Sequence, residues 1–388
     1  LFFLGYILFA VVLIYTLLFG ESDFHRKGYV GSLHRFLTSG LWVILKRIGP
    51  KVCGTALFTK CSSFSNWMWN KPNPVMQIFY LFLVVGGCSL MMYSGYEYVP
   101  GPYLSSVHLV TFPAFLVFVV SFFIFTSRSD PGRITAANHA MYNAIFPLDN
   151  VIYGPATCKT CKHPKIPRSK HCSICGYDSA RHDHHCPWIN NCVGLLNLRW
   201  FLLFLLFTGM IINYVSYLCF YILWGIADAN GLWQYYDNRG VVHDTPYSYI
   251  FQYLVFTAVP IVALFMFTVF IGLVVYGFLG YHLYLISRGT TTNETFKWSD
   301  VNRARRTFLA QQERKRKNTS HLMDEPGEGE LDTNAPFVKG KPLVNIYNRG
   351  VAKNFYEVFF PLQPSTRHPP APAPQHTAKA TTSSKKKQ

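Results

Sequence analysis

The sequence predicts an all-α polytopic membrane protein with about five transmembrane helices and a small cysteine-rich domain between two of them. Half of the 388 residues are hydrophobic and only 14% are charged, a composition that favours a membrane protein. Five stretches are apolar and close to the ~20 residues that cross a ~30 Å hydrocarbon layer as a helix. The Lys and Arg residues lie on alternate connections between these stretches, which is typical of a multi-pass chain.

The five apolar stretches are Leu1–Phe19, Val75–Gly95, Val107–Thr126, Trp200–Trp224 and Phe256–Ile286. The first has no basic leader and no small-residue cleavage site before Glu21, so 1–19 is expected to be a transmembrane anchor rather than a cleaved signal peptide. The last is long enough to tilt or to extend beyond the bilayer. Two helical pairs are therefore expected, over 75–126 and over 200–286.

The net charge of +17 is explained by the orientation of these spans. Of 36 Lys and Arg residues, 35 lie in 20–74, in 127–199 or after Ile286, whereas the loops 96–106 and 225–255 share the remaining one. The positive-inside rule then predicts a lumenal or external N-terminus and a cytosolic C-terminus. A nucleic-acid partner is unnecessary to account for the charge, and none is expected.

The connections differ in character. In the basic cytosolic loop 20–74, the apolar run Leu41–Leu45 is followed by Lys46 and Arg47, which suits either a helix lying among the lipid headgroups or a short turn packed on the bundle. The cytosolic tail 287–360 is followed by 361–388, a basic tract rich in Pro, Ala and Thr that is expected to be disordered. No internal repeat is visible.

The segment 127–199 is polar and carries six of the ten cysteines, all between Cys158 and Cys192. It has no strong periodic apolar pattern, and a region of ~70 residues without its own core usually needs a staple such as a metal ion. Reducing conditions in the cytosol favour metal binding or catalysis over disulfides. A small zinc-stapled cytosolic domain is the expected structure.

The spacing of these residues fits zinc. Zinc prefers four thiolate and imidazole ligands in a tetrahedron, and a Cys-x-x-Cys turn directs two sulfurs to one ion. Two such turns and several neighbouring imidazoles occur here: Cys158-x-x-Cys161, His171-Cys172-x-x-Cys175, His184-His185-Cys186 and Cys192. A zinc-stapled loop without catalysis would also produce this pattern.

A surplus thiol favours catalysis. Cys186 lies beside His184 and Asp183, and it is not needed for a four-ligand site. A carboxylate at Asp183 would orient the imidazole, and the imidazole would draw the thiol proton, so that a thiolate exists at neutral pH. Trp188, two residues on, suits the headgroup level of a bilayer.

These residues resemble the signature of DHHC-type protein S-acyltransferases, the palmitoyltransferases. The resemblance is carried by Asp183-His184-His185-Cys186-Pro187-Trp188, by Asn190-Asn191-Cys192-Val193-Gly194 and by Pro167-Arg168-Ser169-Lys170-His171-Cys172. Thr291-Thr292-Asn293-Glu294 is similar to the family's TTxE motif, and Asn345 to Phe359 to its C-terminal motif, with Asn354 at a matching position.

The resemblance implies two zinc ions and an acyl-enzyme. The first zinc would take Cys158, Cys161, His171 and Asp178, and the second Cys172, Cys175, His185 and Cys192. Asp183 and His184 would activate Cys186, which would accept an acyl group from palmitoyl-CoA and pass it to a cysteine of a membrane-associated substrate protein. Both steps exchange one thioester for another.

One position departs from the family pattern. Asp178 stands where the family has a cysteine; a carboxylate oxygen can bind zinc, although it weakens a sulfur-rich site. His182 or His163 are alternative fourth ligands. If the first site is not metallated, the fold around 158–178 should be loose and autoacylation slow.

Two segments after the last span have structural interpretations. Thr290 to Thr292 can form the N-cap of a following helix as readily as they can act near the active site, and Asn354 is expected to be a structural hydrogen-bonding residue. Asn293-Glu-Thr295 and Asn318-Thr-Ser320 are glycosylation sequons, which should stay unmodified in a cytosolic tail.

The C-terminus Lys385-Lys386-Lys387-Gln388 resembles a dilysine retrieval signal for the endoplasmic reticulum, although a solvated basic tail has the same composition. The spacing before the cysteine-rich core is similar to that of the fungal subgroup that acylates SNAREs. Two other functions compete with the enzyme. A zinc-stapled membrane adaptor, catalytically weak or inactive, is kept open by Asp178, and a small-molecule transporter is disfavoured by the lack of polar residues in the spans.

Overall fold

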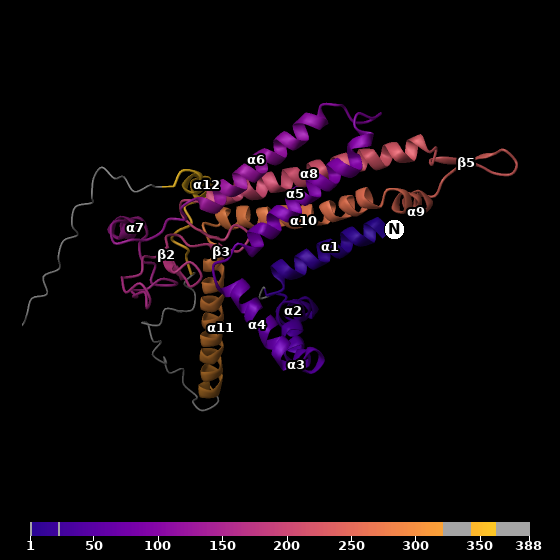
Figure 1. Ribbon diagram of the computed structural model, residues 1–388. Helices are drawn as coiled ribbons and strands as arrows, with labels where there is room; N and C mark the ends of the chain where they lie inside the picture. Colours follow the sequence, from indigo (N-terminus) through magenta and orange to yellow (C-terminus); the bar gives the residue numbers. More distant parts are fainter. Residues whose placement is uncertain (1, 22–23, 321–342, 362–388) are drawn as a thin grey trace, which may run out of the picture.

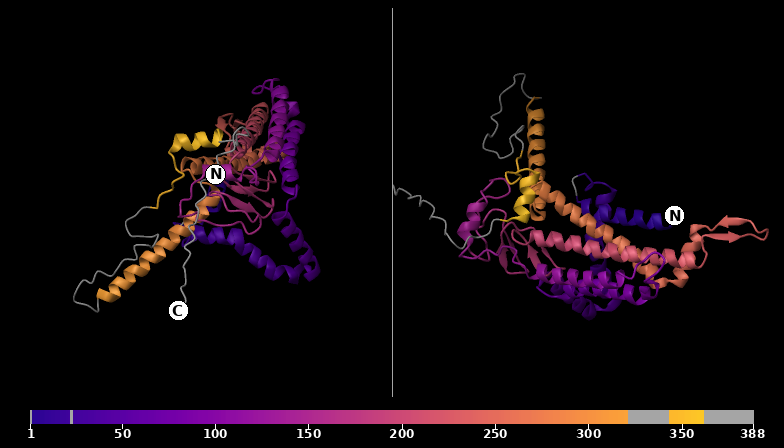
Figure 2. Two further views of the ribbon diagram at one scale, coloured as in Figure 1. Left: turned by 90° about the vertical axis from the view of Figure 1, so that its left-hand side faces the viewer. Right: turned by 90° about the horizontal axis from the view of Figure 1, so that it is seen from above.

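The computed structural model describes residues 2–21, 24–320 and 343–361, and the protein is mostly helical (Figure 1). Four long helices run side by side in a bundle, and they pack around one apolar core. These helices are α5 (Val75–Gly95), α6 (His108–Arg128), α8 (Leu198–Ala229) and α10 (Val259–Ser287). Helix α1 (Phe2–Phe19) lies along α10, and the two further views agree (Figure 2).

Four helices among the described residues are long and apolar enough to cross a membrane: Val75–Tyr98, His108–Arg128, Leu198–Ala229 and Val259–Ser287. Four of the five predicted stretches are thereby found as candidate spans. Helix α1 has 18 residues and no charged side chain, so at 1.5 Å per residue its length of about 27 Å is slightly short of the hydrocarbon thickness.

The last predicted span, Phe256–Ile286, is interrupted near its start. Helix α9 (Tyr247–Thr257) ends at Thr257, and Ala258 adopts φ −128° and ψ 43° before α10 begins at Val259. Pro260 accounts for the break, because it has no N–H group to donate to the Phe256 carbonyl four residues earlier, its ring would clash with that carbonyl in a continuous helix, and it fits the first turn of a new helix.

The segment between α1 and α5 is helical. It contains α2 (Tyr29–Arg35), a π-helical turn over Phe36–Gly40, α3 (Leu41–Cys53) and α4 (Thr55–Asn70). The apolar run Leu41–Leu45 starts α3, so the helical interpretation of this run is confirmed over the short turn. Neither α3 nor α4 has a buried residue.

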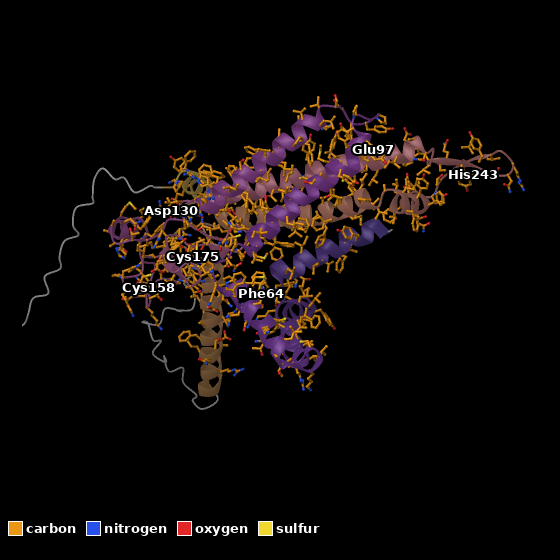
Figure 3. All side chains as sticks on the ribbon, viewed as in Figure 1. Phe64, Glu97, Asp130, Cys158, Cys175 and His243 are labelled. Carbon is orange, nitrogen blue, oxygen red and sulfur yellow. The ribbon has the colours of Figure 1, made fainter. Side chains whose placement is uncertain are left out.

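The cysteine-rich region lies between α6 and α8, at one end of the bundle. It contains α7 (His139–Ile145) and two antiparallel strand pairs: β1 (Lys170–Cys172) with β2 (Tyr177–Ser179), and β3 (His184–Cys186) with β4 (Asn191–Val193). A third pair, β5 (Gln234–Tyr236) and β6 (Val242–Asp244), lies at the other end. The prediction of an all-α protein did not include these short strands. Figure 3 places Cys158 and Cys175 at the cysteine-rich end and Glu97 and His243 opposite.

The cysteine-rich region and the helical bundle share one apolar core. Cys186, Ile189 and Val193 pack in one apolar cluster with Phe201 and Leu205 of α8. Asn197, buried just before α8, accepts a hydrogen bond from the Gly194 amide at 2.9 Å and donates one to the Cys192 carbonyl at 2.9 Å. The strand pair β3–β4 is therefore fixed to the start of α8.

Two helices follow α10 at the same end. Helix α11 (Thr292–Ser320) leaves the bundle at a steep angle, as Figures 1 and 2 both show, and α12 (Val351–Phe359) packs against α10 and α8. Asn354 of α12 is buried and donates hydrogen bonds to the Ser287 carbonyl at 3.1 Å and to Asn348 Oδ1 at 2.8 Å. The structural role predicted for Asn354 is confirmed.

Candidate active site and metal centres

The alternation of side chains along β3 separates two groups of functional residues. Successive residues of a strand point to opposite faces, so His184 and Cys186 share one face and His185 lies on the other. In the β3–β4 register, His185 is paired with Cys192. His185 in the middle of β3 therefore lies on the same side as Cys192, whereas His184 and Cys186 face the bundle.

The four residues of the second predicted zinc site lie together; we call them the second cluster: Cys172, Cys175, His185 and Cys192. The His185 Nδ1 atom lies 3.3 Å from Cys175 Sγ, 3.7 Å from Cys172 Sγ and 3.8 Å from Cys192 Sγ. Zn–S bonds of about 2.3 Å and Zn–N bonds of about 2.0–2.1 Å in a tetrahedron separate neighbouring ligand atoms by about 3.6–3.8 Å. The donors of the second cluster thus fit zinc in type, number and spacing.

The residues of the first predicted site also lie together, and we call them the first cluster: Cys158, Cys161, His171 and Asp178. His171 and Asp178 are paired across β1 and β2. The His171 Nδ1 atom lies 3.3 Å from Cys161 Sγ and 3.7 Å from Asp178 Oδ1. Because His171 and Cys172 are consecutive in β1, their side chains point to opposite faces and reach different clusters.

Asp178 is the member of the first cluster that the sequence left in doubt. Both of its carboxylate oxygens are buried and accept no hydrogen bond from the described residues. A buried carboxylate that accepts no hydrogen bond is costly unless a cation neutralises it, so the residue fits a metal site. His163 Nε2 lies 3.1 Å from Asp178 Oδ2 without hydrogen-bond geometry, and His182 Nδ1 is within 2.6 Å of Ser179 Oγ instead.

The two clusters are copies of one ligand spacing. Each member of the first cluster has a counterpart 14 residues later in the second, with Asp178 corresponding to Cys192. Each Cys-x-x-Cys turn is closed by an amide hydrogen bond of 3.4 Å from the second cysteine to the first sulfur. The expectation that the chain has no internal repeat was therefore wrong, because the two copies interleave and the repeat is carried by single ligands.

The bundle side of β3 carries an acid–base pair. His184 Nδ1 lies 2.6 Å from Asp183 Oδ2. Burial alone would lower the pKa of His184, but its hydrogen bond with Asp183 and the nearby Cys186 thiol raise it to about 10. Burial of Asp183 acts in the opposite direction to the hydrogen bond from His184, which holds the pKa of that carboxyl below its usual value. His184 is therefore well suited to accept a proton while Asp183 stays ionised.

Asp183 is also held by the segment that follows the last span. The Thr292 amide donates to Asp183 Oδ1 at 2.7 Å, and the Thr292 hydroxyl donates to Oδ2 at 2.9 Å. Thr291 and Glu294 form a reciprocal cap at the start of α11, with amide-to-side-chain distances of 3.0 and 3.3 Å. The predicted cap is confirmed, and the same turn also contacts Asp183.

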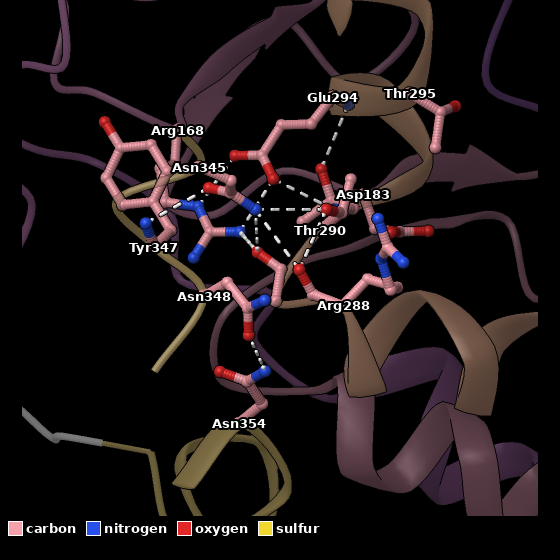
Figure 4. Close-up of polar contacts among 12 residues, drawn as sticks. Arg168, Asp183, Arg288, Thr290, Glu294, Thr295, Asn345, Tyr347, Asn348 and Asn354 are labelled. Atoms are coloured by element: carbon pink, nitrogen blue, oxygen red, sulfur yellow. Dashed lines mark hydrogen bonds and ion pairs between the residues drawn. The ribbon is translucent and has the colours of Figure 1, made fainter. Parts of the chain in front are cut away.

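A buried ion pair fastens this turn to the cysteine-rich region (Figure 4). Arg168 donates from Nε and from a terminal nitrogen to the two carboxylate oxygens of Glu294, each at 2.7 Å, and also to the Gly289 carbonyl at 2.9 Å. Tyr153 donates to the same carboxylate at 3.1 Å. This pair was not predicted from the sequence, where both residues lie in motifs of the DHHC resemblance but 126 residues apart.

A cavity of about 480 Å³ opens beside Cys186 and extends into the bundle. Its walls come from α1, α5, α8 and α10, and nearly all of its lining side chains are apolar, such as Leu17, Val84 and Phe204. Pockets that bind small molecules usually measure about 300–1,000 Å³. Cys186 is buried and lines this cavity, so the apolar walls can hold a long hydrocarbon chain next to its sulfur.

Comparison with known proteins agrees with this geometry. Residues 152–299 match the family model described as DHHC palmitoyltransferase. Palmitoyltransferase swf1 of Schizosaccharomyces pombe is 29% identical over 370 residues, covering 93% of this chain and 97% of the relative. Palmitoyltransferase SWF1 of Yarrowia lipolytica is 34% identical over 275 residues, covering 64% and 69%. Palmitoyltransferase ZDHHC4 of Mus musculus is 29% identical over 249 residues, covering 63% and 65%.

Proposed function

The chain belongs to the DHHC palmitoyltransferase family and is a protein palmitoyltransferase, and from that premise we propose that it forms its acyl-enzyme on Cys186. The observation that carries the proposal is the position of Cys186, which is buried, lines the apolar cavity and shares a strand face with His184. The family implies an acyl-CoA donor.

Each half of the proposed reaction moves one proton and exchanges one thioester. His184 Nε2 takes the proton of the Cys186 thiol, the thiolate adds to the thioester carbonyl of palmitoyl-CoA, and the CoA thiolate leaves and takes that proton. A substrate thiol then gives its proton to His184 and attacks the acyl group, and Cys186 leaves as the thiol. Asp183 stays ionised throughout and stabilises the imidazolium.

The cavity would hold the acyl chain in both half-reactions. Each methylene group that leaves water for an apolar wall contributes roughly 0.8 kcal/mol, so a long chain is favoured over a short one. Binding the chain beside Cys186 also makes the attack effectively intramolecular. This arrangement accounts for an acyltransferase in which a single thiol and a single base supply the chemistry.

Autoacylation of the purified full-length protein tests the proposal. We expect incubation with labelled palmitoyl-CoA to place the label on the peptide that contains Cys186, and neutral hydroxylamine to release it, as it does a thioester. A label on another cysteine would show that Cys186 is not the nucleophile. A chain that takes no label and yet retains its metal would be the zinc-stapled adaptor.

We further propose that each cluster holds one zinc ion, by the four side chains named above. Bound zinc would supply folding energy and keep the strand pairs in place, which is the role of closed four-ligand sites. Cys186, His184 and Asp183 lie outside both clusters. In this proposal the two clusters stabilise the fold around the site, and the residues on the other face of β3 carry out the reaction.

Substitutions of Asp178 separate the two metal sites. Asp178→Ala is expected to lower the zinc content from about two ions per chain to about one, because it removes one of four ligands from the first cluster only. Asp178→Cys is the matched control, and it should keep about two ions and release the first more slowly to a chelator, since thiolate is the softer ligand. Measurement is by metal analysis of purified protein. An unchanged zinc content in Asp178→Ala would exclude Asp178 as a ligand.

We propose that α1 is a fifth span, with the cysteine-rich end in the cytosol. Support comes from its apolar sequence, its contact with α10 and the distribution of Lys and Arg. A glycosylation sequon fused before residue 1 should be modified in microsomes, whereas those at Asn293 and Asn318 should not. Modification at Asn293 or Asn318 but not at the fused sequon would show that the chain has the opposite topology.

For location and substrates, we propose the endoplasmic reticulum membrane and cysteines of membrane-associated proteins, SNAREs among them. The dilysine-like end, Lys385 to Gln388, lies outside the described residues, as does most of 361–388. The location is tested by imaging a tagged full-length chain in which the terminal lysines are replaced by serine. If this variant stays in the endoplasmic reticulum, the dilysine-like end is not its retrieval signal. Acyl exchange on SNAREs in cells that lack the enzyme tests the substrate class.

A further inference from the structure

His282 of α10 is a buried imidazole that the proposed reaction does not use. It is only 2% exposed and lies in an aromatic cage. Its ring centre is 4.6 Å from Phe278, 5.2 Å from Phe201 and 5.6 Å from His184, which it faces at an interplanar angle of 32°. The last span therefore places a second imidazole against the catalytic pair.

The polar edges of His282 are unequal. Nδ1 lies 3.9 Å from Asp183 Oδ2, whereas Nε2 is buried and has no hydrogen-bond partner among the described residues. A neutral imidazole carries one N–H group. If that proton were on Nε2, the N–H group would be buried in the aromatic cage without an acceptor, which is costly. The less costly arrangement keeps the proton on Nδ1, directed at Asp183.

We propose that His282 is a positioning residue for acyl transfer, whose Nδ1–H group steadies the Asp183 carboxylate while its ring limits rotation of His184. The proposal rests on the proposed function of Asp183, His184 and Cys186. The distance of 3.9 Å is longer than a hydrogen bond, and contacts of this kind commonly shorten when substrate fills a site. A preorganised donor in a dry cage stabilises charge more than it would in water.

Two other interpretations of the same residues are possible. Asp183, His184 and His282 offer three donors within reach of one metal ion. However, a metal ion bound through Asp183 Oδ2 and His184 Nδ1 would break the 2.6 Å hydrogen bond between them, whereas an N–H group of His282 can attract the charged carboxylate while that bond and the two from Thr292 stay in place. The second interpretation is plain packing, in which any flat side chain would serve.

Three substitutions of His282 in the full-length protein distinguish donor from packing. His282→Phe keeps a flat ring and removes the donor, and we expect autoacylation about ten-fold slower, the effect of losing a hydrogen bond to a charged group. His282→Asn places an amide donor near the Nδ1 position and should stay within about three-fold of wild type. His282→Gln places its amide near Nε2 and should behave like the Phe variant. Equal rates for all three, or an Asn variant as slow as the Phe variant, would overturn the donor role.

Two more readouts complete the test. In an Asp183→Asn background, His282→Phe should add little further loss, because the donor has lost its charged partner; full additivity would contradict the proposal. The rate of Cys186 alkylation by iodoacetamide should fall with His282→Phe whether or not the protein transfers acyl groups. If His282→Phe slows the alkylation of Cys186 but the wild-type protein takes no palmitoyl label, the proposed function is refuted and the role of His282 is not. If His282→Phe leaves the alkylation rate of Cys186 unchanged, the role of His282 is refuted. A third zinc ion that disappears in every His282 variant would show a metal site instead.

Discussion

Cys186→Ser is expected to lower autoacylation and transfer to substrate below about one thousandth of the wild-type rate, with zinc content and yield unchanged. A serine hydroxyl is a far weaker acid than a thiol, so His184 cannot hold its proton and leave an effective nucleophile. The side chain is almost the same size, and Cys186 is outside both clusters, so the fold should tolerate the change. The measurement is labelling by palmitoyl-CoA with metal analysis on the same sample.

Cys192→Ala is the matched contrast. Cys192 is paired with His185 across β3 and β4 and belongs to the second cluster. Its removal should lower zinc content by about one ion and reduce the yield of folded protein, because a closed zinc site supplies folding energy directly. If Cys186→Ser and Cys192→Ala reduced zinc content and yield equally, the proposal that one face of β3 binds zinc and the other carries the reacting residues would be wrong.

Spacing predicted Cys/His clusters, and the resemblance to the DHHC family implied which residues belong to each of them. The eight predicted ligands gather into the two predicted groups, because ligands in turns and short hairpins are brought together by nearby backbone. The 14-residue repeat was also readable, but it requires aligning single ligands rather than segments. The break at Ala258 was predictable from Pro260, which cannot donate to the carbonyl four residues earlier, whereas an apolar run taken alone favours one continuous helix.

Contacts between distant segments were not readable from spacing. Thr292 bonds Asp183 across 109 residues of sequence, and Arg168 bonds Glu294 across 126. His282 looks like an isolated polar residue in an apolar span until the fold places it beside Asp183. One sequence without related sequences offers no pattern that links such positions, so only the packing of α10 and α11 on the cysteine-rich region identifies them.

Arg168→Met is expected to destabilise the protein by about 3–5 kcal/mol and to slow autoacylation strongly. The substitution leaves the Glu294 carboxylate buried and without its ionic partner, and that carboxylate is fully enclosed. Glu294 caps the turn that holds Thr292 against Asp183, so loosening the turn should also misplace His184. The measurements are thermal unfolding in detergent and the autoacylation rate of the fraction that remains folded.

The double substitution Arg168→Met with Glu294→Leu separates stability from positioning. Replacing both members of a buried ion pair by apolar residues of similar size is often neutral or stabilising, so much of the lost stability should return. The cap of α11 would still lack its carboxylate, and Thr292 would still be poorly held, so autoacylation should stay slow. If the double variant recovered both stability and rate, the pair would serve stability alone; if it recovered neither, Arg168 would act through its bond to the Gly289 carbonyl.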